Sequence, residues 1–327
     1  QTPLLDRTSS RMLVIHNTEK KYEDKHFYDI VDYLHEGDIL VRNNTRVIPA
    51  RLFGTKEETG AHVELLLLRQ LPDDIWECLV GNAKVVKLGT IVSFHDGRLR
   101  AECIEIGEKG LRKMRMIYDG IFNEILDELG NVPLPPYIKE KLNDPERYQT
   151  VYAKVRGSAA APTAGLHFTN EIFTKLKEKG VTVVDVTLHV GLGTFRPMDT
   201  EDVEDHDMHS EVYYMSKEAA DTLNAAKSNG QRIFAIGTTS VRTLESVWNR
   251  FGKFEECSGE TKLFIYPGYQ WHTIDGMLTN FHLPKSTLIM MIASFVGYEF
   301  TLEAYRHAVK EKYRFFSFGD CMLITNE

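Results

Sequence analysis

The apolar residues change their spacing abruptly at about Arg51 and change back after Tyr118. Between these positions, short runs of alternating apolar and polar residues are separated by tight turns, and Asp96-Gly97 and Gly107–Gly110 are hairpin signals. Around six strands without a helix are typical of a small β-barrel. On both sides of this stretch, strand-like and helix-like segments alternate, which predicts an α/β fold. We therefore expect an α/β catalytic domain with a mixed, barrel-like sheet, formed by residues 1–51 and 119–327, and an inserted all-β barrel domain at residues 52–118.

Apolar periodicity and capping residues predict the elements outside the barrel. We expect strands at residues 11–16, 38–42, 181–190, 232–236, 262–266 and 314–324. We expect helices at residues 26–34, 121–129, 144–153, 170–179, 216–229, 241–250, 288–295 and 301–312, with a turn at 237–240.

The stretch from Gly157 to Thr169 contains almost no bulky residue before Leu166. Small residues let a backbone approach another group closely. Thr169 is a plausible N-cap for the helix that follows, and the N-terminus of a helix favours anions. The stretch is therefore either a tightly packed crossover or part of a binding site.

The strand predicted at 181–190 has one apolar face, whereas Asp185, Thr187 and His189 lie on the other. It ends in Gly191-Leu-Gly-Thr-Phe195, and glycines after the carboxyl end of a strand mark the places where α/β sheets bind ligands. Gly-x-Gly alone is a weak signal, and no Gly-Lys-Ser/Thr follows, so the segment is not a P-loop. The strand predicted at 38–42 ends similarly, in Asn43 and Asn44.

Charge is unevenly distributed along the chain, whose net charge is −8. Between Lys84 and Arg115 there are eight basic and four acidic residues, whereas residues 199–211 contain seven acids and no Lys or Arg. A local basic surface is what a polyanion would need on an acidic protein. The four cysteines are widely spaced, which suits a reducing cytoplasm and does not suggest a zinc site. No apolar run reaches membrane-spanning length, and no signal peptide is visible, so we expect a cytoplasmic protein without a membrane partner.

Several long blocks of the sequence are distinctive. They are Asn43-Asn-Thr-Arg-Val-Ile-Pro-Ala-Arg51, Ala160-Ala-Pro-Thr-Ala-Gly-Leu-His-Phe-Thr169, His189-Val-Gly-Leu-Gly-Thr-Phe195, Met208-His-Ser-Glu211, Thr238-Thr-Ser-Val-Arg-Thr-Leu-Glu-Ser246 and Thr279-Asn-Phe-His-Leu-Pro284. Together they resemble the S-adenosylmethionine:tRNA ribosyltransferase-isomerase family of queuosine biosynthesis, and the resemblance covers essentially the whole chain. Relative to that family the chain opens without a Met, so we expect a short leader to be missing.

The resemblance implies transfer of the ribosyl portion of S-adenosylmethionine onto a 7-aminomethyl-7-deazaguanine base of tRNA, giving epoxyqueuosine and releasing adenine and methionine. S-adenosylmethionine is then a consumed co-substrate, and no other cofactor and no metal is implied. The tRNA partner is an anticodon stem-loop, and we expect a monomer.

This chemistry needs a base at the carbon beside the sulfonium and an acid for the departing adenine, and histidines and perturbed carboxylates suit both roles. The catalytic candidates are His189, His209, Glu211 and His167. The substrate-binding candidates are Thr163, Gly165, Gly191, Gly193, Thr194, Thr238, Thr239, Ser240, Arg242, Asn43 and Asn44. Aromatic faces stabilise a sulfonium, and Phe168, Phe195, Tyr213 and Tyr214 are candidates. Each of these residues could also be purely structural.

Three other functions remain as alternatives. A methyltransferase that uses S-adenosylmethionine would need a Gly-x-Gly-x-x-Gly after an early strand, which is absent. A non-enzymatic RNA-binding protein would leave the histidine blocks without a role. A glycosidase with paired carboxylates would need a diagnostic spacing that the acidic stretch does not supply.

Overall fold

The computed structural model of the 327-residue chain describes residues 6–130, 145–191, 211–282, 286–316 and 319–327. The chain divides into two compact units. The main unit contains Gln1–Thr45, Pro135–Val155 and Ala161–Glu327, and the barrel unit contains Arg46–Leu134 and Arg156–Ala160. The barrel unit therefore extends past the expected end at residue 118, because helix α2 (Phe122–Leu129) packs on the barrel through the ring of Phe122, which contacts those of Trp76 and Tyr118.

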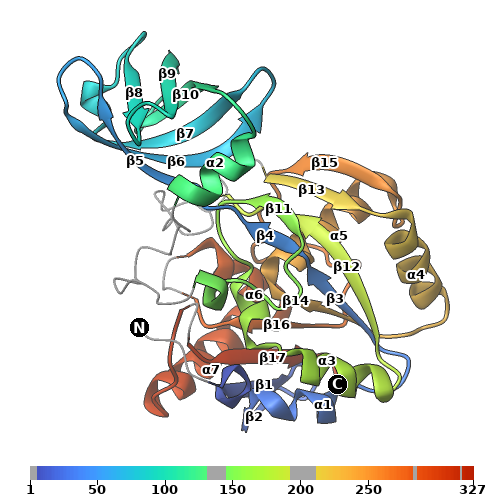
Figure 1. Ribbon diagram of the computed structural model, residues 1–327. Helices are drawn as coiled ribbons and strands as arrows, with labels where there is room; N and C mark the ends of the chain where they lie inside the picture. The colour runs from blue at the N-terminus through green and yellow to red at the C-terminus, as the bar shows by residue number, and fades with distance from the viewer. Residues whose placement is uncertain (1–5, 131–144, 192–210, 283–285, 317–318) are drawn as a thin grey trace. The chain divides into compact units, whose positions relative to one another are not determined.

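The main unit is built on a nine-stranded mixed sheet (Figure 1). In spatial order its strands are β15 (Cys257–Thr261), β13 (Glu211–Met215), β12 (Thr182–Leu188), β3 (Ile39–Asn43), β14 (Ile233–Ile236), β16 (Gly276–Asn280), β17 (Cys321–Thr325), β1 (Arg11–His16) and β2 (Lys21–His26). The four central strands β12, β3, β14 and β16 are parallel to one another. The mixed α/β class with an all-β barrel is confirmed, but the main sheet is open at β15 and β2 among the described strands rather than barrel-like.

Helices cover both faces of the four parallel strands. On one face, α1 (Ile30–Tyr33) and α3 (Asn170–Glu178) contribute to a buried cluster that also contains Leu40, Phe234 and Leu278 from the sheet. Helix α5 (Gly237–Phe251) contacts the same four strands but shares no residue with that cluster, which places it on the opposite face. The remaining helices are α4 (Lys217–Ser228), α6 (Thr287–Val296) and α7 (Tyr298–Lys310).

The barrel unit contains a closed barrel of six strands. In spatial order they are β10 (Leu111–Tyr118), β7 (Ile75–Gly81), β6 (His62–Leu71), β5 (Arg51–Lys56), β8 (Ile91–Phe94) and β9 (Leu99–Ile106), and β9 pairs with β10 to close it. The predicted Asp96-Gly97 hairpin is confirmed, and its tip has three successive residues with positive φ, His95, Asp96 and Gly97. Two short strands, β4 (Thr45–Val47) and β11 (Val155–Ser158), form a separate ladder.

Four local predictions are wrong. The strand expected at 314–324 is, within the described residues, confined to β17 at Cys321–Thr325. The helix expected over 144–153 is, within the described residues, only a 3₁₀ turn at Pro145–Tyr148, because the consecutive residues 148–150 are all buried and one helix face cannot bury three consecutive side chains. The strand expected at 262–266 lies earlier, at β15, where the Thr261 hydroxyl ends the run by accepting from the backbone N–H of Leu263. The turn expected at 237–240 is absent because Gly237, with φ +79°, turns the chain alone and α5 starts there.

Candidate functional site

Most of the candidate residues that the structure describes gather at one edge of the main sheet. Parallel strands that lie side by side end at the same edge, and α/β sheets bind ligands beyond the carboxyl ends of such strands. The next strand of this sheet after β3 is β12, on one side of β3, whereas β14 leads to β16 on the other side. Adjacent strands whose connections run in opposite directions open a crevice. The residues that follow the four strands are His189 and Gly191 after β12, Asn44 and Thr45 after β3, Gly237–Ser240 after β14 and Phe281–His282 after β16.

His189 lies beside the end of β3. Its Nδ1 is 2.8 Å from the hydroxyl oxygen of Thr45, and its ring makes an edge contact with that of Tyr214, with 5.9 Å between the centroids. Partial burial lowers the pKa of His189 below the ordinary value of 6.5. When Nδ1 of a neutral imidazole carries the hydrogen and donates it in a hydrogen bond, Nε2 is unprotonated and can accept a proton.

The two asparagines at the end of β3, Asn43 and Asn44, are hydrogen-bonded within the protein. The side chain of Asn43 donates to the carbonyl of Leu188 and accepts from the backbone N–H groups of Leu188 and Thr45, and it is fully buried. The Asn44 side chain accepts a 2.6 Å hydrogen bond from the Thr187 hydroxyl. Asn43 therefore continues the ladder between β3 and β12, which is a structural role rather than the substrate contact expected for it.

Glu211, at the start of β13, forms a buried ion pair with Arg242 of α5. One carboxylate oxygen accepts from Nη1 of Arg242, and the other accepts from the backbone N–H of Gly191. The two side chains are 5% and 3% exposed, respectively. The pair thus links the end of β12 to the beginning of α5, and both oxygens of Glu211 are occupied.

His167 and Thr163 lie on the 3₁₀ turn η5 (Thr163–His167), which contacts β16. Asn280 donates through its side-chain nitrogen to the Thr163 hydroxyl, so its oxygen faces Nε2 of His167 at 2.8 Å, and Nε2 is the donor of that bond. Burial lowers the pKa of His167. The imidazole is thus fixed as a neutral donor to another side chain, which favours a structural role.

Gly165, on the same turn, is explained by packing. A Cβ at this position would lie 2.0 Å from the hydroxyl oxygen of Tyr152. Of the two alternatives expected for this stretch, a tightly packed crossover or a binding site, the surroundings of Gly165 favour the packed crossover.

The hydroxyl-rich start of α5 adjoins η5. A Cβ added at Gly237 would lie 3.4 Å from that of Ala164 and 3.9 Å from the Thr239 hydroxyl oxygen. Thr238, Thr239 and Ser240 are all buried, and within the described residues the last two hydroxyls have no hydrogen-bond partner.

The aromatic candidates that the structure describes differ in their exposure to solvent. Phe168 is in the core, where its ring contacts those of Phe27 and Phe173, and Tyr213 is 2% exposed. Tyr214 is 43% exposed and lies beside His189, so it is the one of these three that can face a ligand. Gly193, Thr194, His209 and Phe195 lie outside the described residues.

Two residues that position candidate histidines were not among the candidates predicted from the sequence, although both lie in the family-like blocks. Thr45 positions His189, and Asn280 positions His167. Their position directly at the carboxyl ends of β3 and β16 is the sequence signal that could have indicated them. His282, two residues after β16, is half-buried with its Nε2 2.7 Å from the Thr279 hydroxyl oxygen, and desolvation lowers its pKa to about 4.

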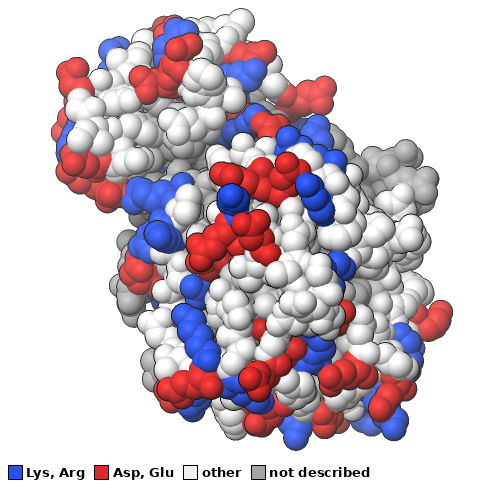
Figure 2. Space-filling view, turned by 90° about the vertical axis from the view of Figure 1, so that its right-hand side faces the viewer, with Lys and Arg blue, Asp and Glu red and all other residues white. Residues whose placement is uncertain are grey.

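The basic surplus of the barrel is largely neutralised. Arg98 pairs with Glu128, Arg100 with Glu57 and Lys113 with Glu105, and the Arg112 guanidinium donates to backbone carbonyls. Figure 2 shows the resulting mixture of both charges over the upper part of the molecule. Lys84, Lys87 and Arg115 are exposed, and the described residues include no ion-pair partner for them.

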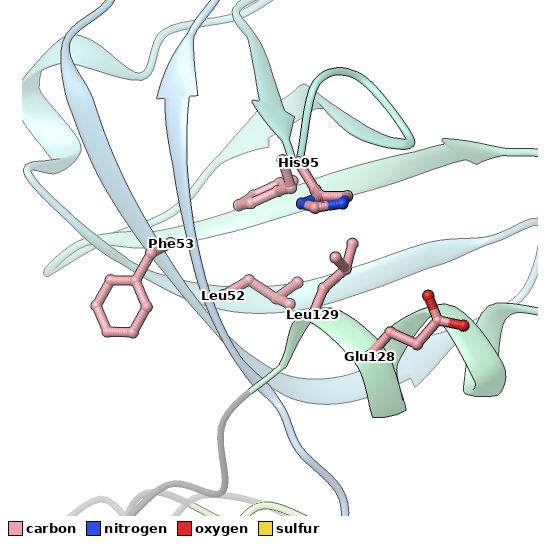
Figure 3. A pocket seen from close by; sticks show the side chains of 6 residues that line it. Leu52, Phe53, His95, Glu128 and Leu129 are labelled. Carbon is pink, nitrogen blue, oxygen red and sulfur yellow. The ribbon is translucent and has the colours of Figure 1, made fainter.

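The barrel unit also contains a cavity of about 340 Å³. It is lined by Leu52, Phe53, Phe94, His95, Glu128 and Leu129. In Figure 3, Leu52, His95 and Leu129 turn toward one another, whereas Phe53 points to the other side of β5. No candidate residue lines this cavity.

The described residues contain no cluster for a metal ion and no single helix able to span a membrane. No group of three or more His, Cys, Asp or Glu side chains is arranged to hold a metal ion. No individual helix in the described ranges meets the length and hydropathy that crossing a bilayer requires; only α6 and α7 taken together do so, and they are bent by 116° at their junction.

Comparison with known proteins identifies the family of the chain. A family model described as queuosine biosynthesis protein matches residues 1–324. The crystal structure of an S-adenosylmethionine tRNA ribosyltransferase from Thermotoga maritima is 39% identical, with 99% of this chain and 95% of that chain covered and a TM-score of 0.56. The match extends over nearly the full length and includes every block at the sheet edge described above. The chain is therefore a member of the queuosine biosynthesis protein family.

Proposed function

We propose that this protein transfers and isomerises the ribosyl portion of S-adenosylmethionine onto the 7-aminomethyl-7-deazaguanine base of tRNA, giving epoxyqueuosine and releasing adenine and methionine. Family membership and the 39% identity to an S-adenosylmethionine tRNA ribosyltransferase support this activity. The observation on this chain that carries it is the position of His189, a neutral imidazole beside an exposed aromatic ring at the carboxyl edge of four parallel strands.

In this proposal His189 is the base. With Nδ1–H donating to Thr45, Nε2 takes the proton from the carbon beside the sulfonium. The exposed face of Tyr214 stabilises the sulfonium cation. Glu211, whose oxygens are occupied, orients Arg242 and Gly191 instead of transferring protons. We propose His209, the catalytic candidate outside the described residues, as the acid that protonates adenine.

The products of one assay separate this function from its alternatives. The protein is incubated with labelled S-adenosylmethionine and tRNA that carries the 7-aminomethyl-7-deazaguanine base. We expect free adenine and methionine in amounts equal to the modified tRNA. S-adenosylhomocysteine with a methylated base would identify a methyltransferase, and binding without turnover would identify a non-enzymatic RNA-binding protein.

We also propose that the reaction needs neither a metal ion nor a resident cofactor. The widely spaced cysteines and the lack of ligand-spaced Cys/His motifs support this. Treatment with a chelator should leave turnover unchanged, and loss of activity that zinc restores would contradict the proposal.

For tRNA, we propose that the barrel unit contacts the backbone of the anticodon stem-loop of one tRNA per monomer. Among its basic residues, Lys84, Lys87 and Arg115 are the exposed ones without an ion-pair partner in the described chain, so their charges are available to phosphates. An unpaired loop base leaves its stack at lower cost than a paired base, which allows it to reach the sheet edge.

Removing these three charges should weaken tRNA binding and reduce its salt dependence. The triple variant Lys84→Gln/Lys87→Gln/Arg115→Gln should lower the slope of log K against log salt by roughly 2, since each lost phosphate contact contributes about 0.7–0.9. The matched control is Arg98→Gln/Arg100→Gln/Lys113→Gln, whose charges acidic neighbours already neutralise. Its slope should fall less. Equal slopes for both variants would contradict the assignment, and S-adenosylmethionine affinity should be unchanged in each.

A further inference from the structure

Unsatisfied buried donors are concentrated at the beginning of α5. In the described chain, Thr239 Oγ1, Ser240 Oγ, and both Nε and Nη2 of Arg242 are buried without a hydrogen-bond partner. A buried donor without a partner is costly, and more so when it is charged. Four such atoms within residues 239–242 indicate that a group absent from the protein itself completes their hydrogen bonds.

The unsatisfied edge of Arg242 has a defined geometry. Nη1 is occupied by Glu211, which leaves Nε and Nη2 as two parallel donors. These two nitrogens form the fork that matches the two oxygens of a carboxylate. Thr239 is three residues earlier and therefore lies on the neighbouring turn of the same helix face.

The surroundings favour a negatively charged group. The site lies at the N-terminus of a 15-residue helix that no side chain caps, and Gly237 begins the helix directly after β14. The amide groups and the dipole of this end favour an anion. Glu211 neutralises one charge but leaves the fork edge open.

We propose that Arg242, with the Thr239 hydroxyl, binds the α-carboxylate of the methionyl portion of S-adenosylmethionine. This inference rests on the proposed function. Arg242 is only 2% exposed, so the group that reaches it must be small and terminal. A carboxylate at the end of a side chain meets this requirement, whereas a tRNA phosphate carries a nucleoside on each side.

The test compares S-adenosylmethionine with its decarboxylated analogue, which keeps the sulfonium, the adenosine and the amine. Calorimetry with the full chain should show about ten- to hundredfold tighter binding of S-adenosylmethionine, the range expected for charge-assisted bonds. Arg242→Lys keeps a cation for Glu211 but lacks the fork. In this variant we expect the preference to fall toward one because S-adenosylmethionine binding weakens while analogue binding is retained.

Two further variants keep the test decisive. Thr239→Val should lower the preference several-fold without disturbing the ion pair. Thr243→Val, one turn later on α5, removes a hydroxyl that already donates to the Thr239 carbonyl, so the preference should be unchanged. An equal loss for both ligands in Arg242→Lys would make the residue merely structural and overturn the proposal. Weakened tRNA binding in place of weakened S-adenosylmethionine binding would overturn it as well.

Failure of this inference is distinguishable from failure of the proposed function. If the parent protein releases adenine and methionine but binds both ligands equally, only the carboxylate site is wrong. If the parent neither binds nor consumes S-adenosylmethionine, both proposals are wrong.

Discussion

Replacing His189 with asparagine is expected to lower kcat by about 10²–10⁴-fold, the usual contribution of a positioned general base. Asparagine is of similar size and can still bond the Thr45 hydroxyl, so the fold and tRNA binding should be kept. Single-turnover release of adenine measures the chemical step directly. His26→Asn, which changes an exposed imidazole that stacks on Tyr28, is the control and should leave the rate unchanged.

The lowered pKa of His189 also predicts how kcat/KM depends on pH. Because burial lowers the pKa of His189 below the ordinary value of 6.5, the imidazole is mainly neutral at pH 7 and is half protonated only at a pH below 6.5. The kcat/KM should therefore fall as pH decreases, with a midpoint below 6.5. This acid limb should disappear in His189→Asn. An acid limb that persists with the same midpoint would assign the titration to another group.

Replacing Glu211 with leucine is expected to lower the free energy of unfolding by about 3–5 kcal/mol, because it leaves the Arg242 charge buried without a counter-charge. Urea unfolding followed by circular dichroism measures the loss. In the double variant Glu211→Leu/Arg242→Met the unpaired charge is gone, so most of the stability should return.

An exposed ion pair provides the comparison. Glu171 and Lys175 are four residues apart on α3, and the side chain of Glu171 is 78% exposed. Glu171→Gln should cost no more than about 0.5 kcal/mol. If Glu211→Leu were as mild as Glu171→Gln, the buried pair would not be the link between β12 and α5 described above.

Local signals in the sequence predicted the elements whose boundaries they determine. As expected, Thr169 caps α3 by accepting a hydrogen bond from the backbone N–H of Ile172, and Gly180 follows the helix with φ +98°. The hairpin signal at Asp96-Gly97 likewise located β8 and β9. These features depend on residues that are neighbours in the chain, so no tertiary information is needed to find them.

Contacts between residues that are far apart in the sequence could not be predicted in the same way. The count of basic residues in the barrel did not show that Arg98 would meet Glu128, which is 30 positions away. The sequence placed Asn43 at a strand end but not between two strands, where its amide is occupied. The fork of Arg242 is visible only because Glu211, 31 positions earlier, occupies the other end of the guanidinium.

The open edge of the main sheet has a consequence for self-association. An unpaired edge strand offers its backbone groups to a second copy of the same chain and is a starting point for aggregation. Strand β2, Lys21-Tyr-Glu-Asp-Lys-His26, carries four charged residues in six, and none of its side chains is buried. Another strand that docked here would have to desolvate those charges. The polarity of β2, which made it hard to recognise as a strand, therefore protects this edge from pairing with other molecules.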